Sequence, residues 1–166
     1  VEGKKPVIAK VHGAAFAAGC QLVASCDLAY STKDAIFATP GVNIGLFCST
    51  PMVAVSRKVN RKVMMKMLLT GEPIKANYAK EIGLINDFFP RNKLNKEILK
   101  IAKKIASKSN LTIKIGKRAF YKQLEMPLAK AYAYTSKMMT LNMMASDAKE
   151  GISAFIEKRK PNWKNK

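Results

Sequence analysis

Residues 13–45, with the sequence GAAFAAGCQLVASCDLAYSTKDAIFATPGVNIG, decide the fold and hold the one candidate active-site frame of this chain. Residues 14–18 are small except Phe16 and predict a turn, which leads through Gly19 into residues 20–26, a segment of helical length that ends at Asp27. A small-residue turn that opens a helix presents free backbone N–H groups at the positive end of the helix dipole, where an oxyanion can bind. A tight, closely packed turn requires small residues as well. Both interpretations of the turn fit the sequence.

Short β-rich segments surround this turn. Residues 7–11 predict a buried strand that closes at Gly13, and residues 28–31 and 35–38 predict two more strands joined by a polar turn. Two glycines and a proline within residues 39–45 predict a shaped loop, which could face a ligand or only turn a corner.

Beyond this stretch the pattern is mostly helical. Ser49 followed by Pro51 predicts a helix N-cap. The predicted helices cover residues 52–59, 61–69, 76–82, 93–108, 111–125 and 129–160, with a strand at 84–89 and a break in the last helix near Ser146 and Asp147.

Length and composition limit the class of protein. With 166 residues the chain is long enough for one domain with a core. No apolar run approaches the roughly 20 residues that span a bilayer, so we expect a soluble chain. The first residue is Val1 rather than Met, which predicts that the native start lies upstream, where a targeting peptide could precede it.

The positive charge is concentrated in the second half of the chain. The net charge of +19 divides into +5 for residues 1–90 and +14 for residues 91–166. Such a field attracts polyanions or phosphate-bearing ligands. An A/T-rich genome or a mitochondrial location would also enrich lysine, so charge alone selects no partner.

Lysine gathers on one face of the predicted helix at residues 93–108. Leu94, Ile98, Ile101 and Ile105 recur at helical spacing on the other face. The lysines are Lys93, Lys96, Lys100, Lys103 and Lys104. They form either a solvated surface over a core stripe or a row that follows phosphates.

The cysteines predict no metal site and no disulfide. Cys20, Cys26 and Cys48 are an odd set without CxxC spacing, and the chain holds a single histidine. We expect buried structural thiols in a reducing compartment.

Five segments in this order carry a resemblance to a known family: KPVIAKVHG, AAGCQLVASCDLAY, FATPGVNIGLF, LLTGEPIKANYAKEIGLIN and EGISAFIEKRKPNW. Together they resemble the enoyl-CoA hydratase/isomerase (crotonase) superfamily from about residue 4 to residue 163, and especially a mitochondrial branch of it.

The resemblance implies an α/β fold, a crotonase-like spiral of ββα turns followed by a C-terminal helical region. Residues 1–90 would form a partial spiral core and residues 91–166 a basic helical region, as one structural unit. Family members usually assemble as trimers or pairs of trimers through the C-terminal helices. They also have a long upstream segment with the first spiral turns, part of the CoA adenine pocket and one of two oxyanion donors. The chain is therefore expected to be a fragment or a natural truncation.

The resemblance also locates the site. The second oxyanion donor of the family falls on the N–H of Ala18, with Gly19 beside it. The two glutamates that activate water in hydratases fall on Gln21 and Gly41, neither of which can act as an acid or base. General acid–base groups contribute about 10²–10⁴ in rate, so no catalytic residue is assigned.

In the family, an aromatic residue and a lysine on the last helix hold the adenosine and 3′-phosphate end of coenzyme A, often from a neighbouring subunit. By position these are Phe155 and Lys158. The alternative is a core phenylalanine next to a surface lysine.

These features predict a degenerate crotonase-fold protein that binds a coenzyme A thioester or has a non-catalytic mitochondrial role related to fatty-acid metabolism, without a metal or other cofactor. One alternative is a structural subunit of a larger mitochondrial assembly. Another is RNA binding through the lysine row, as in an RNA-binding hydratase homologue.

Overall fold

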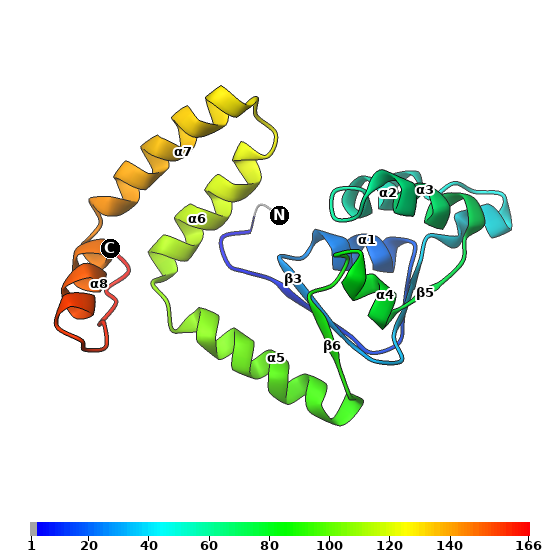
Figure 1. Cartoon of the computed structure of the whole chain (residues 1–166), viewed down its shortest axis with the longest axis horizontal. Coiled ribbons are helices and arrows are strands. Elements are labelled where there is room, and N and C mark those ends of the chain that lie inside the picture. The colour runs from blue at the N-terminus through cyan, green and yellow to red at the C-terminus, as the bar shows by residue number, and fades with distance from the viewer. Residues whose placement is uncertain (1–2) are drawn as a thin grey trace. The chain divides into compact units, whose positions relative to one another are not determined.

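The computed structural model describes residues 3–166, and Val1 and Glu2 lie outside the described residues. Contacts within the chain define two compact units. The first is Val7–Ala102, and the second is Lys103–Lys166 with the segment that ends at Pro6. Figure 1 shows strands and helices mixed in the first unit, and helices in the second.

The strands of the first unit form two three-stranded sheets. They are β1 (Ile8–Val11), β2 (Ala14–Phe16), β3 (Leu28–Thr32), β4 (Ile36–Ala38), β5 (Ile74–Lys75) and β6 (Asp87–Phe89). One sheet has the order β1-β3-β6 with both pairs parallel. In the other, β2-β4-β5, the first pair is parallel and the second antiparallel. Strands β1 to β4 therefore alternate between the sheets, as expected for ββα turns, and β5 then joins the sheet of β4.

A glycine makes the corner between β1 and β2. Gly13 has a φ of +148°, a conformation that side chains rarely adopt, and its carbonyl accepts the N–H of Ile36 at 3.1 Å. The interpretation of residues 14–18 as a turn was wrong for its first part, because Ala14–Phe16 pair with β4 as strand β2. Strand β5 was not predicted, since two residues carry no alternation pattern.

The helices follow the predicted order. They are α1 (Ala18–Ser25), α2 (Ser49–Val55), α3 (Arg61–Thr70), α4 (Ala76–Glu81), α5 (Arg91–Ala106), α6 (Asn110–Gln123), α7 (Leu128–Met143) and α8 (Ser146–Ile156), with a 3₁₀-helix η1 (Pro40–Ile44). The predicted break near Ser146 is confirmed. The N-cap prediction at Ser49 was wrong: Cys48 is the N-cap, and the Ser49 hydroxyl donates to the Phe47 carbonyl.

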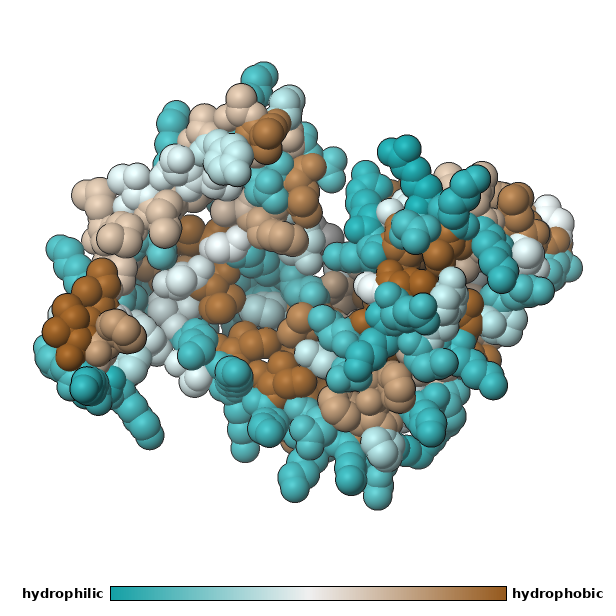
Figure 2. All heavy atoms as spheres, viewed as in Figure 1, coloured by the Kyte–Doolittle hydropathy of each residue, from teal (hydrophilic) through white to brown (hydrophobic). Residues whose placement is uncertain are grey.

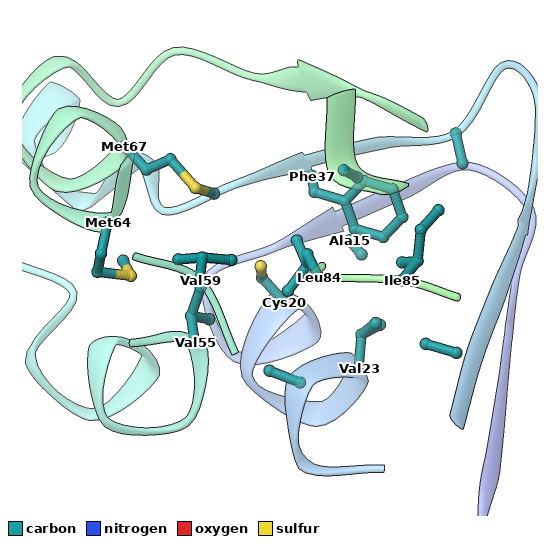
Figure 3. Packing of buried hydrophobic residues seen from close by; sticks show 14 of the residues in the cluster. Ala15, Cys20, Val23, Phe37, Val55, Val59, Met64, Met67, Leu84 and Ile85 are labelled. Carbon is teal, nitrogen blue, oxygen red and sulfur yellow. The ribbon is translucent and has the colours of Figure 1, made fainter. Parts of the chain in front are cut away.

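The core of the first unit lies between α1, the β2-β4-β5 sheet and helices α2 to α4 (Figure 3). Cys20, Phe37 and Val55 are fully buried there. Burying a large apolar side chain contributes roughly 1.5–3 kcal/mol to folding. All three cysteines are free, with Cys20 and Cys48 buried as predicted and Cys26 half-buried.

Helix α5 packs over the β1-β3-β6 sheet. Leu94 and Ile98 are buried with Tyr30 in a second cluster, and the Tyr30 and Phe89 rings stack at 6.1 Å. The predicted apolar stripe of α5 is thus confirmed at Leu94 and Ile98, while Ile101 and Ile105 are half-buried.

The second unit contains the α6–α7 hairpin and α8. Many of its large apolar side chains are exposed: Phe120, Leu124, Leu128, Tyr132, Met139, Leu141, Met143, Met144, Ile152, Phe155 and Ile156. Within residues 3–166 no helix is both long and apolar enough to cross a membrane.

Two carboxylates at the start of α8 hold the C-terminal tail. Asp147 is 2% exposed and accepts the Ser109 hydroxyl and the backbone N–H groups of Lys164 (2.8 Å) and Asn165 (3.0 Å). These bonds, the Ser109 bond foremost, hold the pKa of Asp147 below its usual value.

Glu150, one turn further along α8, makes a two-pronged ion pair with Arg159. Its Oε1 and Oε2 accept Nη1 and Nη2 of Arg159 at 2.6 and 2.9 Å, and Oε1 also accepts the N–H of Asn162 at 2.7 Å. Arg159 lowers the pKa of Glu150 to about 2. We call Asp147, Glu150, Arg159 and Trp163, with the tail that they hold, the tail clamp.

The start of α1 is strained. Its N-cap, Ala17, has a φ of 46° and a ψ of −113°, and its N–H donates to the Ala38 carbonyl at 3.0 Å. A residue with a Cβ held in such a region costs about 1–3 kcal/mol.

We predict that Ala17→Gly stabilises the chain, since glycine adopts a positive φ without steric cost. The free energy of unfolding in urea should rise by about 1 kcal/mol. Ala18→Gly is the matched control, because Ala18 has an ordinary helical φ and a glycine there gains nothing. Equal effects of the two substitutions would contradict strain at Ala17.

We predict that acid weakens the tail clamp. Because the folded-state pKa of Glu150 is lowered from 4.5 to about 2, its stabilisation is complete above pH 4.5 and is lost as the pH falls towards 2. Urea unfolding should therefore show a falling free energy in that window. In Glu150→Gln the fall should be smaller, because the titrating carboxylate is absent; an unchanged profile would refute the assignment.

Candidate functional site

The first turn of α1 has three backbone N–H groups that precede the hydrogen bonds of the helix itself. The helix's own hydrogen bonds begin with Gln21 N–H to the Ala17 carbonyl at 3.0 Å, so the N–H groups of Ala18, Gly19 and Cys20 precede that ladder. Ala18 is exposed, and a Cβ placed on Gly19 would meet nothing within 4 Å. The predicted donor position therefore lies at an exposed helix start, at the positive end of the helix dipole.

Strain at Ala17 fits a functional turn. The hydrogen bond to Ala38 ties the turn to β4, so the first N–H groups of α1 are held in one direction rather than left free to move. An oxyanion site requires donors that are fixed before the ligand arrives.

Gln21 lies one turn into α1 and is half-buried. Its backbone carbonyl accepts the Ser25 hydroxyl at 2.8 Å, which belongs to the helix rather than to a ligand site. The side-chain amide has no titratable proton near neutral pH. Gln21 can donate or accept a hydrogen bond but cannot exchange a proton with a substrate.

Gly41 is closed in by its own loop. Its N–H donates to the Cys48 sulfur at 3.3 Å, and its carbonyl accepts the Leu46 N–H at 2.9 Å. A Cβ at this position would lie 2.8 Å from the Leu46 carbonyl oxygen and 3.0 Å from Cys48 Sγ. A glutamate side chain therefore has no room to begin at residue 41 unless the loop moves.

Cys48 links this loop to α1. Helices α1 and α2 pack together, and Cys48, the N-cap of α2, belongs to the same buried cluster as Cys20. Burial, and then the neighbouring Cys48, raises the pKa of the Cys20 thiol to about 12. The Cys20 thiol therefore remains a protonated packing group at neutral pH. Cys48 is buried in the same cluster, as the sequence predicted for both residues.

The loop is also anchored to α3. Gly71, the C-cap of α3, has a φ of +64°, and the Asn43 amide lies 2.9 Å from where its Cβ would be. Sequence reasoning missed this contact, although the isolated Gly71 after a helical run marks a position where backbone and side chain approach closely.

Phe155 and Lys158 belong to the second unit, at the C-terminal end of α8. Phe155 is 85% exposed, so the interpretation of this residue as a core phenylalanine was wrong within the described chain. Lys158 is also exposed and has a φ of 53°. An exposed aromatic ring and a cation at one helix end suit an adenine ring and a phosphate.

The predicted lysine row lies on α5. Figure 2 shows hydrophilic residues along the lower side of this helix and hydrophobic residues above them. All five lysines are exposed, and none forms an ion pair with a carboxylate among residues 3–166. Within the same residues no group of three or more His, Cys, Asp or Glu side chains could hold a metal ion.

Comparison with known proteins identifies relatives with the same fold. The chain is 54% identical over 158 residues to enoyl-CoA hydratase domain-containing protein 3, mitochondrial, of Rattus norvegicus, covering 95% of this chain and 53% of the relative. It is 38% identical to enoyl-CoA hydratase, mitochondrial, of Pongo abelii, covering 98% and 56%. The chain thus spans about half the length of the curated relatives that it matches.

Solved structures of related proteins have the same fold as this chain. The crystal structure of human enoyl-CoA hydratase domain-containing protein 3 matches with a TM-score of 0.95 and 53% identity, covering 98% of this chain and 64% of that one. An enoyl-CoA hydratase from Mycobacterium smegmatis matches with a TM-score of 0.96 and 51% identity, covering 98% and 63%. The family model for enoyl-CoA hydratase/isomerase matches residues 1–166. With this match over the whole chain and a shared fold, the chain belongs to the enoyl-CoA hydratase/isomerase family.

Proposed function

We propose that this chain is part of an acyl-CoA-binding protein that retains the thioester-binding turn of its family and lacks hydratase chemistry. One observation carries the proposal. The first turn of α1 is exposed at Ala18 and is tied to β4 through Ala17, while the position of one family acid, Gly41, is both without a side chain and closed by Leu46 and Cys48.

The turn binds a carbonyl oxygen without any acid or base. A thioester carbonyl carries partial negative charge on its oxygen, and the Ala18 N–H at the helix start stabilises that charge. Hydration of an enoyl group also needs a proton to be taken from water and returned to carbon. Neither Gln21 nor Gly41 supplies that transfer, so a bound acyl-CoA stays unchanged at this site.

The exposed Phe155 and Lys158 provide the second part of the proposal. A phenylalanine ring can stack on adenine, and an ammonium group can pair with the 3′-phosphate of coenzyme A. The basic surface of the C-terminal half favours such an anionic ligand. Since the chain covers about half of its curated relatives, the binding function of the whole protein includes whatever the remaining length contributes.

We place this function in mitochondria and relate it to fatty-acid metabolism. The relatives from rat, human and mouse are all named as mitochondrial proteins. No catalytic step is assigned to the chain within that role.

A structural role in a larger assembly is the second candidate. The exposed apolar residues of α6 to α8 support it, because such side chains are usually covered by another protein surface. Formation of a trimer or hexamer through these helices fits both candidates. The free lysine row of α5 supports the third candidate, RNA, but no aromatic side chains accompany it for base stacking.

We predict that an acyl-CoA raises the stability of the full chain. At about 100 times its dissociation constant, the ligand should add about 2.7 kcal/mol, seen as a higher melting temperature. Ala18→Pro tests the turn, since proline is accepted at the first helical position but lacks the N–H donor. The variant should lose affinity for acyl-CoA and keep its affinity for free coenzyme A, which has no thioester carbonyl. The absence of stabilisation by any acyl-CoA would favour the assembly role.

We predict that placing glutamate at both residue 21 and residue 41 neither gives hydratase activity nor keeps the stability of the unaltered chain. Gln21→Glu should fold normally, whereas Gly41→Glu should lower the free energy of unfolding by about 1–3 kcal/mol because of the Leu46 carbonyl. Gly19→Ala is the matched control, with open space for its Cβ. Hydration of crotonyl-CoA, followed by loss of enoyl absorbance, should stay at background in the double variant. A fully stable, active double variant would show that the loop is not closed.

A further inference from the structure

Lys158 has an unusual backbone for a lysine. With a φ of 53° it occupies the left-handed region that a side chain with a Cβ disfavours. It follows the C-cap Glu157 directly, a position that helices most often give to glycine. A strained residue of this kind persists only where the surrounding structure enforces it, and such residues concentrate at functional sites.

Hydrogen bonds at the end of α8 complete this geometry. The N–H of Lys158 donates to the Phe155 carbonyl at 3.3 Å, and the N–H of Arg159 donates to the Ala154 carbonyl at 3.0 Å. This pair of bonds is the Schellman motif, which requires a left-handed residue between the helix and the following chain. Lys158 is that residue.

The side chain of Arg159 locks the motif. Its guanidinium binds both oxygens of Glu150 on α8 and also donates to Glu157 at 2.6 Å. Residues on both sides of Lys158 are thereby tied together. Lys158 itself is left out of this network of ion pairs among the described residues.

The tail beyond Arg159 returns along α8 and is held at several further points. The Trp163 ring lies against Gly151, where a Cβ would be 3.2 Å from Cη2, and its indole N–H donates to the Ser107 carbonyl at 2.9 Å. Asp147 then binds the N–H groups of Lys164 and Asn165. A tail fixed at both ends leaves Arg159, and with it Lys158, little freedom to relax.

We propose that the tail clamp is a positioning device that holds Lys158 in its left-handed conformation so that its ammonium group is presented to the 3′-phosphate of coenzyme A. The inference rests on the proposed acyl-CoA function and extends it to Asp147, Glu150, Arg159 and Trp163, which touch no ligand. Phe155, one turn before Lys158, lies exposed at the same helix end, where it can accompany the lysine as a platform for the adenine. The clamp thus confers selectivity for the phosphorylated ligand.

The test compares coenzyme A with dephospho-coenzyme A, which lacks only the 3′-phosphate. Calorimetric titration of the full chain should give tighter binding of coenzyme A. In Lys158→Gly that preference should vanish while the melting temperature is unchanged or higher, because glycine suits the left-handed position. Lys160→Ala removes a neighbouring exposed lysine of the same tail and should keep the preference.

The clamp itself is tested by Glu150→Gln, which removes the charge that holds Arg159. The preference should fall by about fivefold, the scale of one partly exposed charge interaction. The double variant Glu150→Gln/Lys158→Gly should show no lower preference than Lys158→Gly alone, since the clamp acts through the lysine. If the clamp were merely structural, the substitution would weaken the binding of coenzyme A and of dephospho-coenzyme A equally. If Glu150→Gln does not fold, Trp163→Phe is tested instead. This variant loses only the indole hydrogen bond to Ser107, so the preference for coenzyme A should fall by a smaller factor.

The outcomes separate the two proposals. Binding of both ligands with equal affinity by the unaltered chain overturns the positioning role and leaves acyl-CoA binding in place. A preference that survives Glu150→Gln or Trp163→Phe also overturns the positioning role alone. Failure to bind any form of coenzyme A overturns both.

Discussion

The burial of α1 against the β2-β4-β5 sheet and α2 is the constraint on which the first unit depends. Cys20 and Phe37 are completely enclosed there, so the start of α1 cannot shift without opening the core. Ala17, directly before this helix, has a strained backbone and is tied to β4 by its hydrogen bond to Ala38. The strain at Ala17 thus lowers the stability of the fold at a turn whose geometry suits a carbonyl oxygen.

The two positions that align with the family's glutamates differ in space as well as in side-chain type. Gln21 has nearly the shape of a glutamate but carries an amide in place of the titratable carboxyl group, and it is half-buried in its helix. At Gly41 the loop has closed onto Cys48 and Leu46, and Asn43 joins it to Gly71. A binding frame can persist under these conditions because backbone donors do not depend on side chains, whereas proton transfer does.

In the second unit, the basic and the acidic side chains have different structural roles. Most of its lysines are exposed on the surface, while its few carboxylates are concentrated on α8, where Asp147 and Glu150 bind the returning tail. The low pKa values of these two groups reflect how many donors each accepts. In a chain of net charge +19, acidic residues placed in this way order the backbone rather than neutralise the surface.

The sequence by itself determined the family, the order of the helices, and strands β1, β3 and β4, because these depend on local periodicity and on motifs in a fixed order. It also located the apolar stripe of α5 and the break before α8. Only the tertiary structure decided that Ala14–Phe16 pair as a strand, that Gly41 lies under Leu46 and Cys48, and that the tail holds Lys158 in a left-handed conformation. These contacts join residues far apart in the chain or depend on a single dihedral angle, and neither leaves a periodic signal in the sequence.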